Sequence, residues 1–151
     1  MKKLSQMWRR IASKRLGTIY TFTNISMVPT FIPGDRALVK SFKRSSIKPA
    51  RFDVIILRHP KAEREDLKRI VGLPGERVEI RRGNLMIDGA IIPEQYVTKE
   101  MPVDWSYQWI LGAEEYIVLG DNRSAPGITD SRSYGPVHSD FLVGLVTRRI
   151  P

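Results

Sequence analysis

Short runs of β-branched and aromatic residues, separated by Pro and Gly, recur along most of the chain and predict β-strands. Arg82-Gly83-Asn84 and Asp88-Gly89 fit the tight turns of successive hairpins. No repeat at a fixed period is present, so we expect a mainly β fold, as folded antiparallel sheets or a partly open barrel. The expected strands are Gly17–Phe22, Ala37–Phe42, Asp53–Leu57, Leu67–Val71, Arg77–Arg81, Leu85–Ile87, Tyr116–Leu119 and Leu142–Arg148.

Two segments depart from this strand pattern. In residues 2–16, Leu4, Met7, Trp8 and Ile11 recur at helical spacing opposite basic residues, which predicts a short amphipathic helix. Such a helix suits either a membrane surface or a docked position on the domain's own core. We therefore expect an N-terminal helix in residues 1–16 and a β domain in residues 17–151. Residues 94–113 mix aromatic and charged residues without a clean period, and we expect a loop there.

The basic charge of the chain is concentrated at its N-terminal end. The net charge is +9, and residues 1–51 contain twelve Lys or Arg residues but a single acid, Asp35. The remaining 100 residues contain thirteen basic and fifteen acidic residues. This asymmetry suggests an anionic partner for residues 1–51, either lipid headgroups or nucleic acid, and a merely soluble basic surface is the equal alternative.

Composition excludes several classes of site. The chain has no cysteine and two histidines, His59 and His138, so we expect no disulfide, no thiol nucleophile, no metal and no cofactor. No run approaches the ~18 apolar residues of a membrane-spanning helix. Residues 1–16 also lack the apolar core of a secretory signal peptide.

Two residues are candidates for chemistry when read from their surroundings alone. Ser26 lies between an expected strand and a turn limited by Pro29, a rigid position that suits a nucleophile, although most serines in turns are structural. Lys68 lies in an apolar strand beside Arg69, and strand alternation predicts that one of these two cations points inward. A buried amine avoids the cost of desolvation by losing its proton and then acts as a general base. The alternative is that Lys68 reaches solvent.

Three ordered motifs carry a resemblance to the signal peptidase I family. They are a serine box at Ser26-Met27-Val28-Pro29-Thr30, a lysine box at Lys68-Arg69-Ile70-Val71-Gly72-Leu73-Pro74-Gly75-Glu76, and a box that begins Gly120-Asp121-Asn122-Arg123 and ends Asp130-Ser131-Arg132-Ser133-Tyr134-Gly135-Pro136-Val137. The resemblance spans roughly residues 24–148. It implies the β catalytic fold of that family and the activity of a serine endopeptidase.

The resemblance also implies a role for individual residues. Ser26 would be the nucleophile and Lys68 the general base, with the Ser26 backbone N–H and the Asn24 side chain as oxyanion donors. Met27 would line the substrate cleft. Four further residues would support the catalytic loop, and for Asp130 and Arg132 the sequence itself favours an ion pair. The supporting residues are Asp130, Arg132, Gly120 and Asn122.

Two departures from the family pattern stand out. Ile128 occupies the position where relatives usually carry a hydroxyl that orients the lysine, so Ser124 or Thr129 is the candidate for that task. The chain also has no spanning helix before the serine box. We therefore expect a peripheral membrane location through residues 2–16, or a cytoplasmic one if the chain is similar to the short, anchor-free proteases that trim nickel-type superoxide dismutase. A third explanation is an anchor removed by truncation.

The expected function is therefore removal of an N-terminal leader from a precursor protein, bound as an extended strand and cut after small residues. A self-cleaving Ser/Lys regulator would need a DNA-binding domain upstream, and only 25 residues precede the serine box. A non-catalytic basic module that binds anionic lipid or nucleic acid through residues 1–51 would explain the charge but not the three boxes. A Ser-His-Asp triad would need His59 or His138, and neither lies in an orienting motif.

Overall fold

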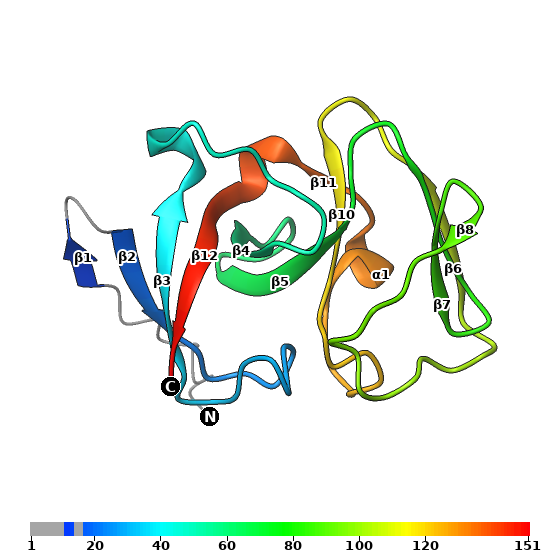
Figure 1. Cartoon of the computed structure of the whole chain (residues 1–151), viewed down its shortest axis with the longest axis horizontal. Helices are drawn as coiled ribbons and strands as arrows, with labels where there is room; N and C mark the ends of the chain where they lie inside the picture. Colours follow the sequence, from blue (N-terminus) through cyan, green and yellow to red (C-terminus); the bar gives the residue numbers. More distant parts are fainter. Residues whose placement is uncertain (1–10, 14–16) are drawn as a thin grey trace.

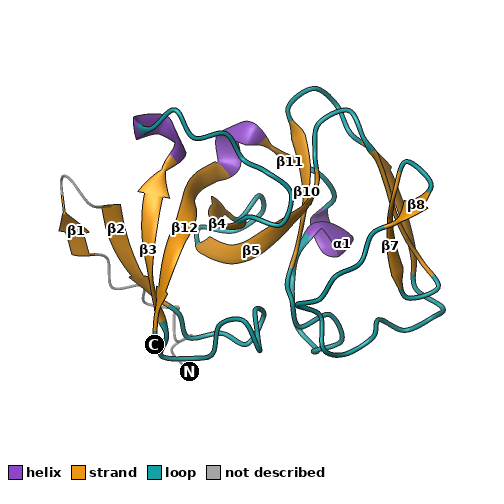
Figure 2. Ribbon diagram, in the orientation of Figure 1, coloured by secondary structure: helices purple, strands orange, loops and turns teal. Residues whose placement is uncertain are grey.

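The computed structural model describes residues 11–13 and 17–151, which form two antiparallel sheets with short helical turns between them (Figures 1 and 2). The larger sheet has the strand order β1-β2-β3-β12-β4-β5-β10-β11 and the smaller sheet β8-β7-β6-β9. Helix α1 (Ser131–Tyr134) and the 3-10 turns Phe42–Arg44 and Ser139–Phe141 connect strands. The strands are β1 Ile11–Ser13, β2 Gly17–Thr21, β3 Arg36–Ser41, β4 Val54–Arg58, β5 Glu65–Gly72, β6 Arg77–Arg81, β7 Asn84–Ile87, β8 Ala90–Ile91, β9 Ser106–Ile110, β10 Glu115–Leu119, β11 Val137–His138 and β12 Leu142–Ile150.

The mainly β prediction is confirmed, and each of the eight expected strands is present with ends that differ by at most two residues. Both expected hairpin turns also form. Arg82 and Gly83 have φ values of 50° and 77°, and Asp88 and Gly89 have 49° and 86°. Positive φ at both central residues is the mark of the turn type whose twist matches that of the paired strands.

Strand β5 is covered on both of its faces. Every residue from Asp66 to Gly72 is buried, because the side chains alternate between different apolar clusters. Leu67 packs with Tyr20 and Phe22, which lie just before the serine box. On the opposite face of β5, Ile70 packs with Ile55 of β4. The charged side chains of Asp66, Lys68 and Arg69 in this strand are accordingly buried.

The helix expected for residues 2–16 lies largely outside the described residues. The part that is described, Ile11–Ser13, contradicts the prediction, because it forms strand β1 and pairs antiparallel with β2. The backbone groups of these three residues are satisfied across the sheet edge instead of along a helix.

The loop expected for residues 94–113 was wrong for its second half. Ser106–Ile110 form β9, which pairs with β6 along its whole length. Tyr107 and Trp109 alternate with exposed residues and pack against the core of the smaller sheet. The period-2 pattern of Tyr107 and Trp109 was the signal that could have located this strand.

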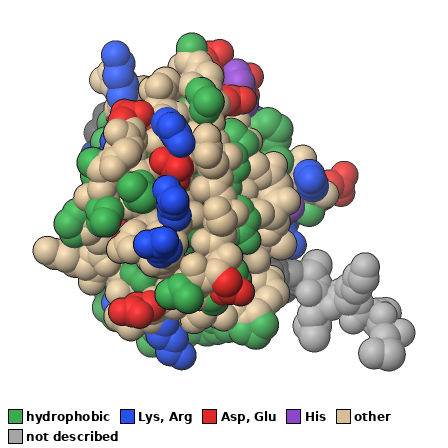
Figure 3. Space-filling view, turned by 90° about the vertical axis from the view of Figure 1, so that its right-hand side faces the viewer, with side chains coloured by type: hydrophobic (Ala, Val, Ile, Leu, Met, Phe, Trp, Pro, Cys, Tyr) green, Lys and Arg blue, Asp and Glu red, His purple; other side chains and the backbone are tan. Residues whose placement is uncertain are grey.

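The outer face of the smaller sheet carries charges of both signs. Basic and acidic side chains are interspersed over the face seen in Figure 3, and on β6 Arg77 forms an ion pair with Glu79. This surface therefore has basic and acidic side chains side by side, in keeping with the nearly equal numbers of the two kinds in residues 52–151. Of the helices in the described ranges, none has the length and apolar composition to cross a bilayer.

The core of the smaller sheet provides a first test of this packing. Ile80 is fully buried, whereas Ile110 on the neighbouring strand is 76% exposed. Ile80→Ala should lower the free energy of unfolding by about 2–5 kcal/mol, since it leaves a cavity. The matched Ile110→Ala variant should change the free energy of unfolding by less than about 0.5 kcal/mol. Urea denaturation measures both values, and equal losses would contradict the packing described here.

Candidate active site

Ser26 begins a turn that follows β2 and is tied to the segment after β10. The backbone N–H of Asn122 donates to the Ser26 carbonyl at 3.0 Å, and the Asn122 side chain donates to the Ile25 carbonyl at 3.0 Å. Within the turn, the Phe31 N–H donates to the Met27 carbonyl. These bonds fix the backbone on both sides of Ser26, whose residue surface is 4% exposed.

Gly120 allows the two segments to approach this closely. A Cβ atom at Gly120 would lie 2.6 Å from the Ser26 carbonyl oxygen, closer than real contacts permit. The Gly120 N–H donates at 3.0 Å to Asp130, whose carboxylate also binds Arg132 at 2.7 Å. The expected ion pair between Asp130 and Arg132 is thus present. Through Gly120 it is linked to residues 120–122, which contact the backbone of Ile25 and Ser26.

A buried ion pair joins all three sequence motifs. Arg69 of the lysine box binds Asp121 of the third box through two contacts of 2.9 and 2.6 Å, and Thr30 of the serine box donates to the same carboxylate. The Arg69 guanidinium also donates to the Phe52 carbonyl and stacks 3.9 Å from the centre of the Tyr96 ring. Two parallel contacts from a planar guanidinium impose orientation as well as attraction.

Lys68 points to the other face of β5 and is also buried, with 2% of its surface exposed. The expectation that one of Lys68 and Arg69 faces inward is therefore exceeded, because β5 is covered on both faces and buries the two. Burial lowers the pKa of Lys68 below its usual value, and the positive charges of Arg64 and Arg132 lower it further. Asp66 and Asp130 act in the opposite direction without reversing the shift.

Ser26 and Lys68 line one small pocket of about 140 Å³. Within the described part of the chain, the Lys68 amine has no hydrogen bond or ion pair, and none joins it to the Ser26 hydroxyl. Catalytic hydrogen bonds are often long before substrate binds, so the shared pocket is the relevant observation. The pocket is lined by Asn24, Ile25, Ser26, Arg64, Asp66, Lys68, Pro126, Gly127, Ile128 and Thr129.

Asn24 differs from the expected arrangement. Its side-chain oxygen accepts from both the backbone N–H of Ser26, at 3.2 Å, and the Ser26 hydroxyl, at 2.9 Å. The two groups expected to donate to an oxyanion are thus paired with each other, as in a turn closed by an Asn side chain. An incoming carbonyl oxygen would compete with Asn24 for the Ser26 N–H.

The remaining expected site residues are only partly brought together. Met27 is buried in the core with Phe22 and Phe31 and does not line the pocket that holds Ser26 and Lys68, so its place in a substrate cleft stays a prediction. Ser124 is exposed and also lies outside the pocket lining. Thr129 does line the pocket, and its hydroxyl is bound by Arg64 at 2.8 Å.

His59 does not contact Ser26, as a Ser-His-Asp triad would require. His59 ends the β4 side of the β4–β5 turn, and its ring nitrogens contact the Lys61 N–H and the Thr129 hydroxyl rather than Ser26. Burial lowers the pKa of His59, so the ring is neutral over most of the physiological range. No group of three or more His, Asp or Glu side chains that could hold a metal occurs among the described residues.

Comparison with known proteins agrees with the three motifs. The sequence profile described as "Signal peptidase, peptidase S26" matches residues 11–150. The chain belongs to the signal peptidase S26 family. This is a family of serine endopeptidases, and the resemblance expected from the motifs is therefore confirmed.

Curated signal peptidases resemble the chain over most of its length. Signal peptidase I of Leptolyngbya laminosa is 32% identical over 79% of this chain, and signal peptidase I V of Bacillus subtilis is 29% identical over 85%. The alignments cover 61% and 82% of those two proteins, so the chain spans less than two thirds of the first. A crystal structure of a signal peptidase I from Enterococcus faecalis has 32% identity and a TM-score of 0.60, covering 67% of this chain and 98% of that one.

Several residues of this S26 site were not identified from the sequence. Asp66 and Arg64 line the pocket as an ion pair, and Glu94 holds the fully buried side chain of Arg123. An acid two positions before Lys68 on the same strand face was a visible signal for Asp66. Glu94 lies in the segment read as a loop, where no local pattern indicates its distant partner.

The contact at Gly120 yields a prediction for the site. In Gly120→Ala the added methyl group must displace the backbone of Ser26, and a shift of about 1 Å at a reacting group can lower the rate of catalysis about 100-fold. Gly112→Ala is the matched control, since its Cβ would meet nothing closer than 3.4 Å. Cleavage of a leader-bearing precursor measures both, and a Gly120→Ala enzyme as active as the control would show that this approach does not position Ser26.

Proposed function

We propose that the chain removes N-terminal leaders from precursor proteins by Ser/Lys catalysis, with Ser26 as nucleophile and Lys68 as general base. The observation that supports this proposal is the pocket shared by the Ser26 hydroxyl and a lysine whose amine is buried. The names of the related signal peptidases support the class of substrate.

The reaction follows from the protonation state of Lys68. Because burial lowers the pKa of Lys68, the neutral amine is available to accept the Ser26 proton as the hydroxyl oxygen attacks the scissile carbonyl carbon. The resulting ammonium returns that proton to the leaving amine when the peptide bond breaks. Water then attacks the acyl-enzyme with Lys68 again as the base, which releases the carboxylate product and restores Ser26.

The oxyanion is stabilised in this proposal by the Ser26 backbone N–H. That N–H is held by Asn24 in the free protein, so the scissile carbonyl oxygen replaces the Asn24 oxygen as substrate binds. Asn24 then presents its amide N–H group as the second donor, a role that needs rotation of its side chain. Thr129 is the better placed of the two expected hydroxyls for orienting Lys68, because Ser124 is exposed and outside the pocket lining.

The volume of the pocket bears on the cleavage sequence. At about 140 Å³ it is well below the roughly 300–1,000 Å³ of typical small-molecule sites. We infer from this volume a preference for small residues before the cut.

We infer that the basic N-terminal residues bring the protein to the membrane surface where its substrates are. Residues 1–51 bear a net charge of +11, which attracts an anionic membrane surface where precursor leaders insert. Peripheral membrane contact through residues 2–16 is therefore part of the proposal, with the cytoplasmic maturation proteases as the alternative setting.

Substitution of Lys68 tests the dyad and separates it from a structural role. Lys68→Met keeps the length of the side chain but removes the base, so cleavage of a leader-bearing precursor should fall by about 100-fold or more. The free energy of unfolding should stay equal or rise, because an amine no longer has to be buried. Ser26→Ala should lower the cleavage rate to the same level as Lys68→Met.

Lys61→Met is the matched control, since Lys61 is exposed on the turn between β4 and β5. It should leave both the cleavage rate and the stability unchanged. Wild-type cleavage by Lys68→Met would rule out the proposed base, whatever its stability.

A further inference from the structure

The surroundings of the Lys68 amine contain an acid that the family pattern did not suggest. Asp66 precedes Lys68 by two residues on β5, so strand alternation places both on one face, and both line the 140 Å³ pocket. Their neighbours across the sheet are apolar, since Asp66 pairs with Leu57 and Lys68 with Ile55. Charges in such apolar surroundings interact more strongly than charges in water.

Arg64 holds the Asp66 carboxylate in this position. The Arg64 guanidinium binds Asp66 at 2.9 Å and also donates to the Thr129 hydroxyl at 2.8 Å. The Asp66 side chain is only 4% exposed, whereas the Arg64 side chain is 37% exposed. Arg64 therefore closes the pocket at its solvent side and links the turn between β4 and β5 to the catalytic loop.

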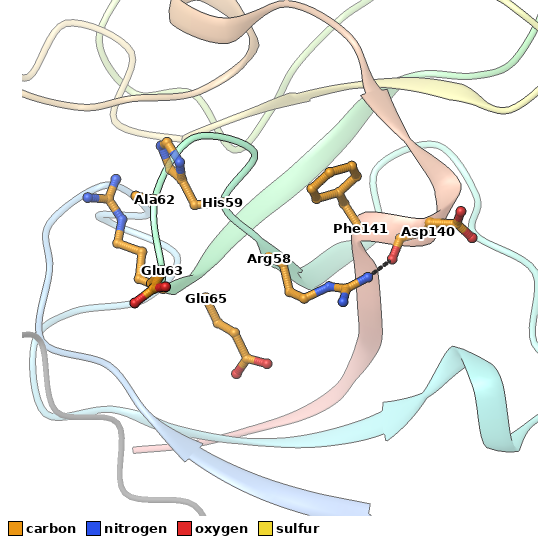
Figure 4. A pocket seen from close by; sticks show the side chains of 8 residues that line it. Arg58, His59, Ala62, Glu63, Glu65, Asp140 and Phe141 are labelled. Carbon is orange, nitrogen blue, oxygen red and sulfur yellow. Dashed lines mark hydrogen bonds between the residues drawn. The ribbon is translucent and has the colours of Figure 1, made fainter.

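Arg64 also borders a second, wider groove of about 670 Å³. Figure 4 shows this groove with Glu63, Glu65 and Asp140 among its labelled lining residues. This groove is lined by Arg58, His59 and Phe141 among others, and neither Ser26 nor Lys68 reaches it. Arg64 lines both this groove and the pocket that holds Lys68. Its contact with Asp66 therefore keeps the Arg64 side chain between the two.

We propose that the Arg64–Asp66 pair is a positioning device that holds a carboxylate beside the Lys68 amine and sets the pH at which this base works. The proposal rests on the proposed Ser/Lys function. Asp66 stabilises the ammonium that forms when Lys68 accepts the Ser26 proton, and Arg64 limits that stabilisation so that Lys68 is neutral again for the next step. Ile128 leaves room for such a device, because it supplies no hydroxyl where relatives usually have one.

The charges around Lys68 form two opposed pairs. Asp66 with Arg64 lies on β5 and its preceding turn, and Asp130 with Arg132 lies at the start of α1. In each pair the acid raises the pKa of Lys68 and the arginine lowers it. Asp130 and Arg132 also support the loop under Ser26, so only the first pair can be altered without disturbing the nucleophile.

Two further titratable groups face the same region. His59 contacts Thr129, and its pKa is lowered by burial and by the positive charge of Arg64, although Asp66 acts in the opposite direction. Tyr134 packs on the Lys68 face of β5, and burial raises its pKa far above neutrality, so the phenol stays uncharged. Neither group changes the expected sign of the effects of Asp66 and Arg64.

The test compares the pH dependence of kcat/KM for cleavage of a leader-bearing precursor. Asp66→Asn removes a negative charge beside Lys68, so the acid limb of the profile should move to lower pH than in the wild type. Arg64→Gln removes a positive charge and should move the acid limb to higher pH. Asp66→Glu keeps the charge and should restore the wild-type limb at least in part.

Glu63→Gln is the matched control, because it removes one negative charge from the same turn at an exposed position. It should leave the acid limb where it is. A merely structural role for the pair would lower the plateau of both variants without shifting their acid limbs in opposite directions, and that result would overturn the proposal.

The outcome separates this proposal from the proposed function. If Lys68→Met cleaves as the wild type does, the Ser/Lys mechanism itself fails. If Lys68→Met is inactive while the acid limbs of Asp66→Asn and Arg64→Gln coincide with that of the wild type, only the role of the pair fails. Urea denaturation shows whether Asp66→Asn folds. If it does not, the direction in which the acid limb of Arg64→Gln moves decides the matter, since the Arg64 side chain is 37% exposed and its replacement disturbs the core less.

Discussion

The buried contact between Arg69 and Asp121, with Thr30 on the same carboxylate, is the interaction on which the site depends. It joins the turn after β2, strand β5 and the loop after β10, which are far apart in the sequence. A buried ion pair of this kind contributes little to net stability when complete, but loss of one partner leaves an uncompensated charge in the core. The pair therefore enforces one arrangement of the three segments, and that arrangement brings Ser26 and Lys68 to one pocket.

Two adjacent cations on β5 meet opposite fates for a physical reason. The Arg69 guanidinium cannot lose its proton in a protein, so its burial requires the carboxylate of Asp121 and the carbonyl of Phe52. Lys68 has no carboxylate bound directly to its amine among the described residues, and burial is accommodated by a lowered pKa. Strand alternation thus places a structural cation, Arg69, and the proposed proton acceptor, Lys68, on opposite faces of β5.

Much of the fold was predictable because it depends on local signals. The Gly83 and Gly89 turns and the β-branched runs encode the strands independently of their partners. The ordered motifs placed Ser26 and Lys68 in the candidate site through resemblance, since a serine in a turn and a lysine in a strand are each ambiguous alone. The structure adds that both line one pocket.

Contacts between distant segments were not predictable from local pattern. The packing of Met27 in the core and the ion pair between Glu94 and Arg123 depend on which segments meet in space. Asn24 shows the same limit, because its residue type suited an oxyanion donor while its side chain accepts from Ser26. The position of Asp66 could have been predicted, because its spacing of two residues from Lys68 places both on the same face of the strand.

The central claim is that Lys68 is a buried amine poised to be neutral when Ser26 reacts. Its direct test is an NMR pH titration of the lysine side-chain ε-methylene signals in the whole protein, with Lys68→Met used to assign the Lys68 resonance. The account predicts that Lys68 titrates at distinctly lower pH than the exposed lysines, such as Lys61. A Lys68 signal that titrates together with those lysines would contradict it.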